Sequence, residues 1–165
     1  MEPRFAKYNP HSGEDSLVEY PGQAKIINAT KISGRTQKGL GIGVLNAITQ
    51  KQFATFFDTA TKEQYREENM PLTNYNILVF DQTLKNNSSV SLINTNVWRS
   101  GKDYDANVTS ALFDLNNKKN TWNIGGNVSF SNIIEEGGKT TTGYAHNIYF
   151  GKTSGRFNFN VWQEL

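Results

Sequence analysis

The sequence lacks several features that would point to common protein classes. It contains no cysteine, so it can form neither a disulfide framework nor a thiolate metal site. Its formal net charge is only +2 and its lysines and arginines are scattered, which argues against a nucleic-acid partner. Mean hydropathy is −0.59 and no apolar run approaches the length of a membrane helix. The search for a long apolar run does not detect membrane β-strands, because only alternate residues of such strands face lipid.

The sequence also lacks a recognisable signal peptide and contains little proline. The first sixteen residues, MEPRFAKYNPHSGEDS, lack the basic and apolar regions of a signal peptide. We therefore expect an exported form of the protein to have been processed, or cut from something larger. After Pro21 the only remaining proline is Pro71, so long uninterrupted strands are allowed.

The residues that are abundant favour strands. The chain is rich in Asn, Thr, Gly, Ser and aromatic residues, and a helical turn is expected only at Thr61–Asn69. We predict about eight strands: Ala24–Arg35, Gly39–Phe57, Leu72–Leu84, Ser88–Arg99, Tyr104–Asn116, Thr121–Ile133, Thr141–Gly151 and Arg156 to the end.

The connections between these strands alternate in character. The segments TQKG, KNNS, NNKK and GKTSG are tight and polar, as β-turns require. The segments DTATKEQYREENMP, SGKD and IIEEGGKT lie between them and are looser. An up-and-down barrel of a bacterial outer membrane has short turns on one side and longer loops on the other. The alternation therefore favours such a barrel over a soluble sandwich.

The glycine-rich run from Lys38 to Thr49, KGLGIGVLNAIT, could suggest a phosphate-binding loop. The dinucleotide fingerprint needs a third glycine where Val44 stands, and no Gly-Lys-Ser/Thr follows as a Walker loop would require. The aliphatic residues of the run instead recur at every second position, which indicates a strand. Glycine on the opposite side lets a strand bend or lets other groups approach closely.

Alternation in several strands predicts one apolar and one polar face. In Thr121–Phe130 an apolar stripe has an aromatic residue at each end, about 26 Å apart along an extended strand. We predict the following lipid-facing residues: Leu40, Ile42, Val44, Tyr75, Ile77, Val79, Trp122, Ile124, Val128, Phe130, Phe157, Phe159 and Val161. The predicted lumen-facing residues are Gly39, Gly41, Gly43, Asn123, Asn127, Asn158 and Asn160.

Two strands do not alternate cleanly. In Ser88–Arg99 and in Tyr104–Leu115 the apolar residues change face part-way along, and a β-bulge would restore the phase. Asp81 has the parity of Ile77 and Val79 and is expected near the short-turn end, where a carboxylate is tolerable.

No combination of residues predicts an enzyme or a cofactor site. His11 and His146 have no carboxylate or serine at a known catalytic spacing, and His146 is expected to be a lumen or girdle residue. Asp103, Asp105 and Asn107 are spaced like a calcium loop, but Val108 stands where that loop needs glycine. We keep these three as a weak metal candidate and expect a solvated loop.

Ala24 to Thr49, AKIINATKISGRTQKGLGIGVLNAIT, resembles a known group of proteins. The likeness is to the C-terminal barrel region of large Bacteroidetes-type outer-membrane proteins of uncharacterised function. In these proteins the barrel follows a carbohydrate-binding domain of the family-9 type. Lys31–Arg35, the glycine-alternating strand and the pair Asn46-Ala47 carry the resemblance.

NTNVWRSGKDYDANV and GKTSGRFNFNVWQEL are consistent with the same region, so the likeness spans most of the chain after Pro21. These motifs are structural, and the resemblance implies no active-site residues. Here the sugar-binding domain is missing and the sequence ends on Leu165 instead of an aromatic residue. We therefore expect a piece of a larger barrel, with two unpaired edges.

The predicted fold is all-β: an antiparallel up-and-down meander that forms part of a transmembrane barrel. Residues 1–23 are expected to be an irregular N-terminal segment and 24–165 to be barrel strands. The predicted function is a non-enzymatic pore or surface platform of the bacterial outer membrane, without a cofactor. Its expected partners are membrane lipid, surface lipoproteins or other outer-membrane subunits, and a glycan is a further candidate ligand. The alternative is a soluble β-sandwich that binds carbohydrate through exposed tryptophans.

Overall fold

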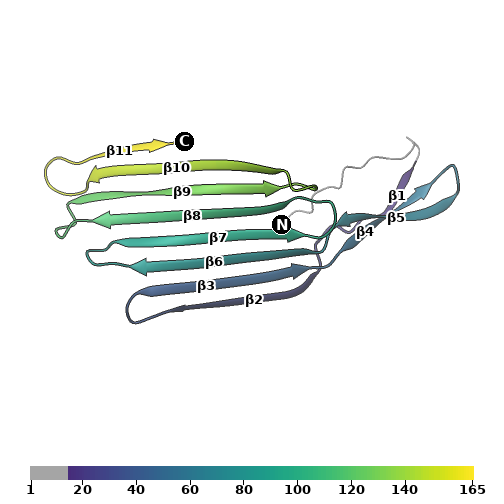
Figure 1. The fold of residues 1–165 in the computed structure, drawn as a ribbon, viewed down its shortest axis with the longest axis horizontal. Coiled ribbons are helices and arrows are strands. Elements are labelled where there is room, and N and C mark those ends of the chain that lie inside the picture. The colour runs from purple at the N-terminus through teal and green to yellow at the C-terminus, as the bar shows by residue number, and fades with distance from the viewer. Residues whose placement is uncertain (1–14) are drawn as a thin grey trace.

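The computed structural model describes residues 15–165, which are all-β (Figure 1). These residues form eleven antiparallel strands in two sheets. They contain no helix that is long and apolar enough to span a membrane. The strands are β1 (Ser16–Glu19), β2 (Ile26–Arg35), β3 (Leu40–Thr49), β4 (Gln52–Asp58), β5 (Glu63–Met70), β6 (Thr73–Thr83), β7 (Ser89–Arg99), β8 (Asp105–Asn116), β9 (Trp122–Ile134), β10 (Thr140–Lys152) and β11 (Phe159–Glu164).

The larger sheet is a meander of eight strands in a single layer (Figure 1). Its order is β2-β3-β6-β7-β8-β9-β10-β11, and every neighbouring pair is antiparallel. The expected all-β meander of about eight strands is therefore confirmed. β2 and β11 are the two edges of the sheet, so the described residues do not form a closed barrel.

The connections lie at two opposite ends of this sheet (Figure 1). We call one the turn end, where β2–β3, β6–β7, β8–β9 and β10–β11 are joined. The other is the hairpin end, where β4 and β5 project between β3 and β6. Apart from the β4–β5 hairpin, the links at the two ends do not show the difference in length that the sequence suggested. Residues 135–139 join β9 to β10, whereas the supposedly tight link 153–158 is longer.

The smaller sheet has the order β1-β4-β5 and differs from the expectation in three ways. The predicted strand Gly39–Phe57 is interrupted at residues 50–51 and forms β3 and β4. The segment Thr61–Asn69, where a helical turn was expected, is mostly β5, because pairing with β4 overrides its helical propensity. Residues 1–23 were expected to be irregular, yet β1 lies among them and pairs with β4; residues 1–14 lie outside the described part.

The only buried apolar core in residues 15–165 belongs to this smaller sheet. Ala54, Phe56 and Met70 are its buried hydrophobic side chains. The Phe56 ring stacks on Tyr65 with ring centroids 5.4 Å apart. The eight-stranded sheet has no buried hydrophobic side chain, so nothing in the described residues covers either of its faces. A sheet of this size without a core must be covered by something else.

Candidate functional site

The strand register assigns each residue of the large sheet to one of two faces, because residues opposite each other on antiparallel strands point to the same side. We call the side with Gly41 and Gly43 the glycine face. The side with Trp98 and Trp122 is the tryptophan face. Continuous register from β2 to β11 connects these assignments across the sheet.

An uncovered apolar band occupies the turn-end half of the tryptophan face and extends across the sheet. Its side chains are 40–50% exposed at several positions, for example Val44 at 44%, Leu92 at 46% and Phe150 at 43%. Aromatic rings lie at both ends of the band on β9. Trp122 packs on Phe150 with centroids 5.5 Å apart, and Phe130 packs on Tyr144 at 5.3 Å.

Most of the predicted lipid-facing residues share this face. The register places nine of them there: Leu40, Ile42, Val44, Trp122, Ile124, Val128, Phe130, Phe159 and Val161. Phe157 precedes β11 and its ring lies 5.9 Å from that of Phe159.

The expectation that Tyr75, Ile77 and Val79 of β6 share a face with Ile42 and Val44 of β3 is wrong. Val79 lies opposite Gly43, Ile77 opposite Leu45 and Tyr75 opposite Ala47. These three β6 residues therefore belong to the glycine face and cannot face the same medium as Ile42. The physical reason is that a shift of one residue in pairing register moves every side chain of a strand to the other face.

Five of the predicted lumen-facing residues share the glycine face: Gly41, Gly43, Asn123, Asn127 and Asn160. The other two lie outside the strands. Gly39 belongs to the β2–β3 turn with φ of 83°, and its N–H donates to the Thr36 carbonyl at 3.0 Å. Asn158 lies in the β10–β11 link.

Glycine on this face lets a long side chain cross the strand. The guanidinium of Arg35 on β2 passes over Gly41 on β3 and binds the carboxylate of Asp81 on β6. A Cβ at Gly41 would lie 3.0 Å from the guanidinium. Asp81 also accepts a hydrogen bond from Ser91 on β7 at 2.8 Å. One ionic cluster thus joins four adjacent strands near the turn end.

A second crossing of the same design joins β8, β9 and β10. Tyr149 on β10 lies over Gly125 on β9 and donates a 2.5 Å hydrogen bond to Asp114 on β8. A Cβ at Gly125 would overlap the Tyr149 hydroxyl. The Asp114 carboxylate also accepts hydrogen bonds from the amides of Asn116 and Asn123, each at 2.9 Å. The carboxylate is therefore well supplied with donors.

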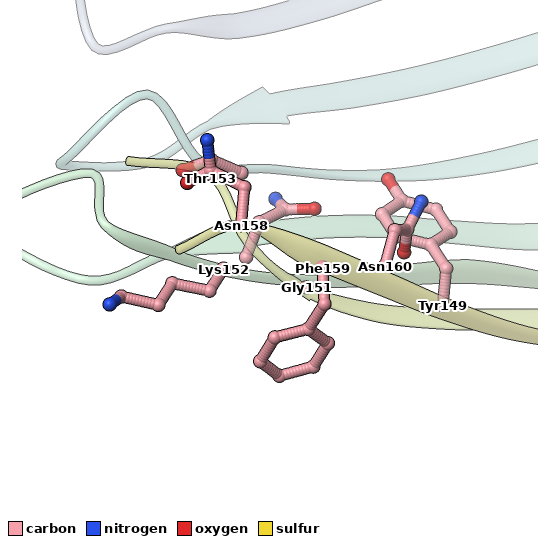
Figure 2. Close-up of a pocket in the computed structure, with 8 residues that line it drawn as sticks. Tyr149, Gly151, Lys152, Thr153, Asn158, Phe159 and Asn160 are labelled. Atoms are coloured by element: carbon pink, nitrogen blue, oxygen red, sulfur yellow. The ribbon is translucent and has the colours of Figure 1, made fainter. Parts of the chain in front are cut away.

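A pocket of about 330 Å³ opens next to this second crossing (Figure 2). Gly151 lies between Asn123 and Asn160 in the register, and a Cβ there would come within 2.9 Å of the Phe159 carbonyl oxygen, so β10 and β11 pack closely at this point. In Figure 2 the side chains of Lys152 and Phe159 extend away from those of Thr153 and Asn158. The residues that line the pocket are Asn123, Tyr149, Gly151, Lys152, Thr153, Asn158, Phe159 and Asn160. The pocket thus combines polar side chains with a mainly apolar accessible lining.

On β6, β7 and β8 the two faces exchange polarity half-way along the strand. Toward the turn end the glycine face bears the two polar crossings, and toward the hairpin end it bears Ile77, Ile93 and Val97. The phase change seen in the sequences of β7 and β8 is therefore real. These strands pair without a register shift from Ser89 to Val97, so the expected bulge is absent there.

The weak metal candidate is not supported. Among residues 15–165 there is no group of three or more His, Asp or Glu side chains that could hold a metal ion. Asp105 instead accepts a 2.7 Å hydrogen bond from the Arg99 backbone, and Asn107 bonds to Asn94 at 3.2 Å. His146 lies on the tryptophan face beside Tyr144 with ring centroids 5.3 Å apart; His11 lies outside the described residues.

Comparison with known proteins gives a family and no further neighbour. The model of a domain of unknown function, DUF5916, matches residues 2–165. The chain belongs to this family. No curated protein and no solved structure matches it. The family carries no assigned activity, so a function for this DUF5916 domain has to be argued from its own residues.

Proposed function

We propose that this DUF5916 domain is part of the wall of a bacterial outer-membrane β-barrel. It acts without catalysis, as a passive pore or as a surface platform for nutrient or glycan handling. The observation that carries the proposal is the uncovered apolar band on the tryptophan face. A single sheet layer with exposed aromatic and aliphatic side chains across eight strands needs an apolar medium, and the hydrocarbon of a bilayer supplies one.

The glycine face supports an aqueous interior near the turn end. The Arg35–Asp81 and Tyr149–Asp114 crossings place charged and hydrogen-bonding groups there, on the side away from the apolar band. In a transmembrane barrel polar side chains face the lumen and apolar ones face lipid. Neither crossing could lie against hydrocarbon without a large desolvation cost.

The two open edges support a larger barrel. Backbone groups at a membrane-exposed edge would be left without hydrogen-bond partners, so β2 and β11 require further strands. β2 runs from the hairpin end to the turn end and β11 runs the opposite way. An even number of additional antiparallel strands would therefore close the barrel.

The resemblance noted in the sequence extends this proposal. It suggests an outer-membrane barrel that accompanies a family-9-like carbohydrate-binding domain, with membrane lipid and surface lipoproteins or other outer-membrane subunits as partners. The pocket beside Tyr149, where three asparagines meet a mainly apolar lining, is the candidate position for a glycan ligand, because amide groups pair well with sugar hydroxyls.

Detergent-dependent folding tests the proposal. We expect a β-rich far-UV CD spectrum and heat-modifiable gel migration with micelles present, and neither without them. A monodisperse protein that melts cooperatively in plain buffer would contradict the proposal. That result would favour the alternative, a soluble β-sandwich carbohydrate-binding module in which a second sheet covers the tryptophan face.

A further inference from the structure

The charged residues of the large sheet are divided unequally between its two ends. The connections at the turn end are residues 36–39, 84–88, 117–121 and 153–158. They carry five cations and no aspartate or glutamate: Lys38, Lys85, Lys118, Lys119 and Arg156. Both links of this sheet at the hairpin end, in contrast, carry carboxylates, which are Asp103 in one and Glu135 and Glu136 in the other. The turn end is therefore a basic rim.

The cations of this basic rim are available to an anionic partner. All five are exposed, and none forms an ion pair with a carboxylate of residues 15–165. The two carboxylates of the strands nearest this end are already engaged on the glycine face. Asp81 binds Arg35, and Asp114 accepts the hydroxyl of Tyr149. The charge of the rim is thus not neutralised within the described residues.

Two of the turn-end connections are hydrogen-bonded to each other. Thr153 of the β10–β11 link donates its N–H to the Thr121 carbonyl at 3.0 Å. Its hydroxyl donates to the Asn120 carbonyl at 2.9 Å. Both carbonyls belong to the β8–β9 turn, so these bonds hold the link that contains Arg156 against the turn that contains Lys118 and Lys119.

Lys152 extends this group of cations onto the tryptophan face. It ends β10, and its ammonium lies 6.0 Å from the centroid of the Trp122 ring. A Cβ added at Gly155, the residue before Arg156, would lie 3.5 Å from the same ammonium. Lys152 thus lies beside the β10–β11 link. We call the four cations of these two connections the basic cluster: Lys118, Lys119, Lys152 and Arg156.

The basic cluster borders the aromatic end of the apolar band. The Phe159 ring lies 5.9 Å from that of Trp122 and 6.0 Å from that of Phe150, measured between centroids. From the middle of β9 toward the turn end, the tryptophan face presents aliphatic side chains, then aromatic rings and then cations. A lipid leaflet presents matching groups in the same order: acyl chains, the interface where tryptophan is enriched, and the headgroups.

We propose that the basic cluster binds the phosphate of an anionic phospholipid headgroup. The inference rests on the proposed function and adds the chemistry of the lipid and its place on the wall. Four cations without a neighbouring carboxylate attract a phosphate, and the adjoining aromatic rings and apolar band accommodate the acyl chains attached to it. A free phosphate would use the cations alone. Short turns lie on the periplasmic side of outer-membrane barrels, so the lipid belongs to the leaflet on that side.

The native tryptophans provide two reporters at opposite ends of the same face. Trp122 adjoins the basic cluster, whereas Trp98 lies near the hairpin end. One variant, Trp98→Phe/Trp162→Phe, keeps only the first reporter, and Trp122→Phe/Trp162→Phe keeps only the second. Each protein is reconstituted in vesicles of phosphatidylcholine with a minor fraction of phosphatidylglycerol. Bromine atoms on the acyl chains of one lipid or the other quench a tryptophan that the lipid contacts.

We expect phosphatidylglycerol to be preferred at Trp122 and not at Trp98. Its association constant relative to phosphatidylcholine should be at least about fivefold higher at Trp122, the effect of one cation at an anionic lipid surface. Concentrated salt should weaken this preference, because it screens exposed charges. At Trp98 the two brominated lipids should quench equally.

Charge removal identifies the residues responsible. In the protein that keeps only Trp122, the variant Lys118→Gln/Lys119→Gln/Arg156→Gln should bring the ratio of the two association constants close to one. Lys152 stays in place because it contacts the reporter ring. The matched control Lys102→Gln/Lys139→Gln removes cations from the hairpin end and should leave the ratio unchanged.

The outcomes separate this inference from the proposed function. Equal quenching of Trp122 by the two brominated lipids, or a preference that survives the triple variant, would overturn the headgroup site and leave the barrel intact. A preference at Trp98 instead would also overturn it. Loss of the preference on adding soluble glycerol phosphate would overturn the lipid assignment, because a free phosphate then fills the cluster. Failure of either lipid to quench either tryptophan contradicts the barrel itself.

Discussion

A single arginine placed on the tryptophan face should reveal whether that face lies in lipid. Val128 lies near the middle of the β9 stripe, opposite Ala111 on β8 and His146 on β10. The stripe from Trp122 to Phe130 spans about 26 Å along the strand, so Val128 lies within about 7 Å of its centre. A charge at that depth is surrounded by hydrocarbon in a barrel.

The expected cost follows from this depth. Arginine on the lipid face of a barrel destabilises it by about 2–4 kcal/mol at the midplane and by about 0–1 kcal/mol near the interface. We therefore expect Val128→Arg to lower the free energy of unfolding by about 2–4 kcal/mol. Asn132→Arg, further along the same face, should cost about 0–1 kcal/mol. Urea titration of reversible folding in lipid vesicles, followed by tryptophan fluorescence, measures both values.

The neighbouring residue on the other face provides the control. Asn127 belongs to the glycine face, so Asn127→Arg should cost clearly less than Val128→Arg. Equal losses for Val128→Arg and Asn132→Arg would show that depth does not matter, and a larger loss for Asn127→Arg would mean that the faces are reversed. Either result would refute the lipid-facing assignment.

Three further predictions concern other parts of the chain. Tyr149→Phe removes one hydrogen bond and should lower the free energy of unfolding by about 0.5–1.5 kcal/mol. Gly125→Ala should lower it by at least as much in the native background and by much less in a Tyr149→Ala background, because the added Cβ then has room. A double-mutant cycle measured by chemical denaturation checks this coupling. Phe56→Ala should destabilise the small sheet by about 3–5 kcal/mol, seen as protease cleavage of the β4–β5 hairpin while the large sheet stays protected. Hydrogen bonds, chiefly from Thr61, hold the pKa of Asp58 in the folded protein below its ordinary value of 3.8. The ionised carboxylate therefore stabilises the turn fully above the ordinary pKa, and this stabilisation is lost as the pH falls through the lower pKa of the folded state. Protease protection of the β4–β5 hairpin should drop in acid, and Asp58→Asn should abolish this pH dependence.

Much of the large sheet could be predicted from local patterns. Turn residues bounded its eight strands, and the period-two alternation in β3 and β9 separated their faces correctly. The predicted role of glycine also holds, since Gly41 and Gly125 let long side chains pass. These features depend on residues within one strand or its own turn, which sequence patterns report directly.

The features that failed depend on pairing between strands. The apolar residues of β6 alternate as expected, but only the pairing of Val79 with Gly43 shows which face they occupy. Likewise β5 forms because it pairs with β4, despite a run of good helix formers. Asn46, Asn76, Asn96 and Asn107 are separate residues in the sequence, and register alone aligns them in one row across the sheet.

The central claim is that one face of this sheet contacts lipid and the other contacts water, and a residue-by-residue scan of β9 tests it most directly. Each residue from Trp122 to Phe130 is replaced by a spin-labelled cysteine in the otherwise cysteine-free chain and reconstituted in bilayers. The account predicts alternation: Ile124 and Val128 accessible to lipid-dissolved oxygen, Asn123 and Asn127 to a water-soluble nickel chelate. Equal accessibility of both sets to the water-soluble reagent would contradict the membrane assignment.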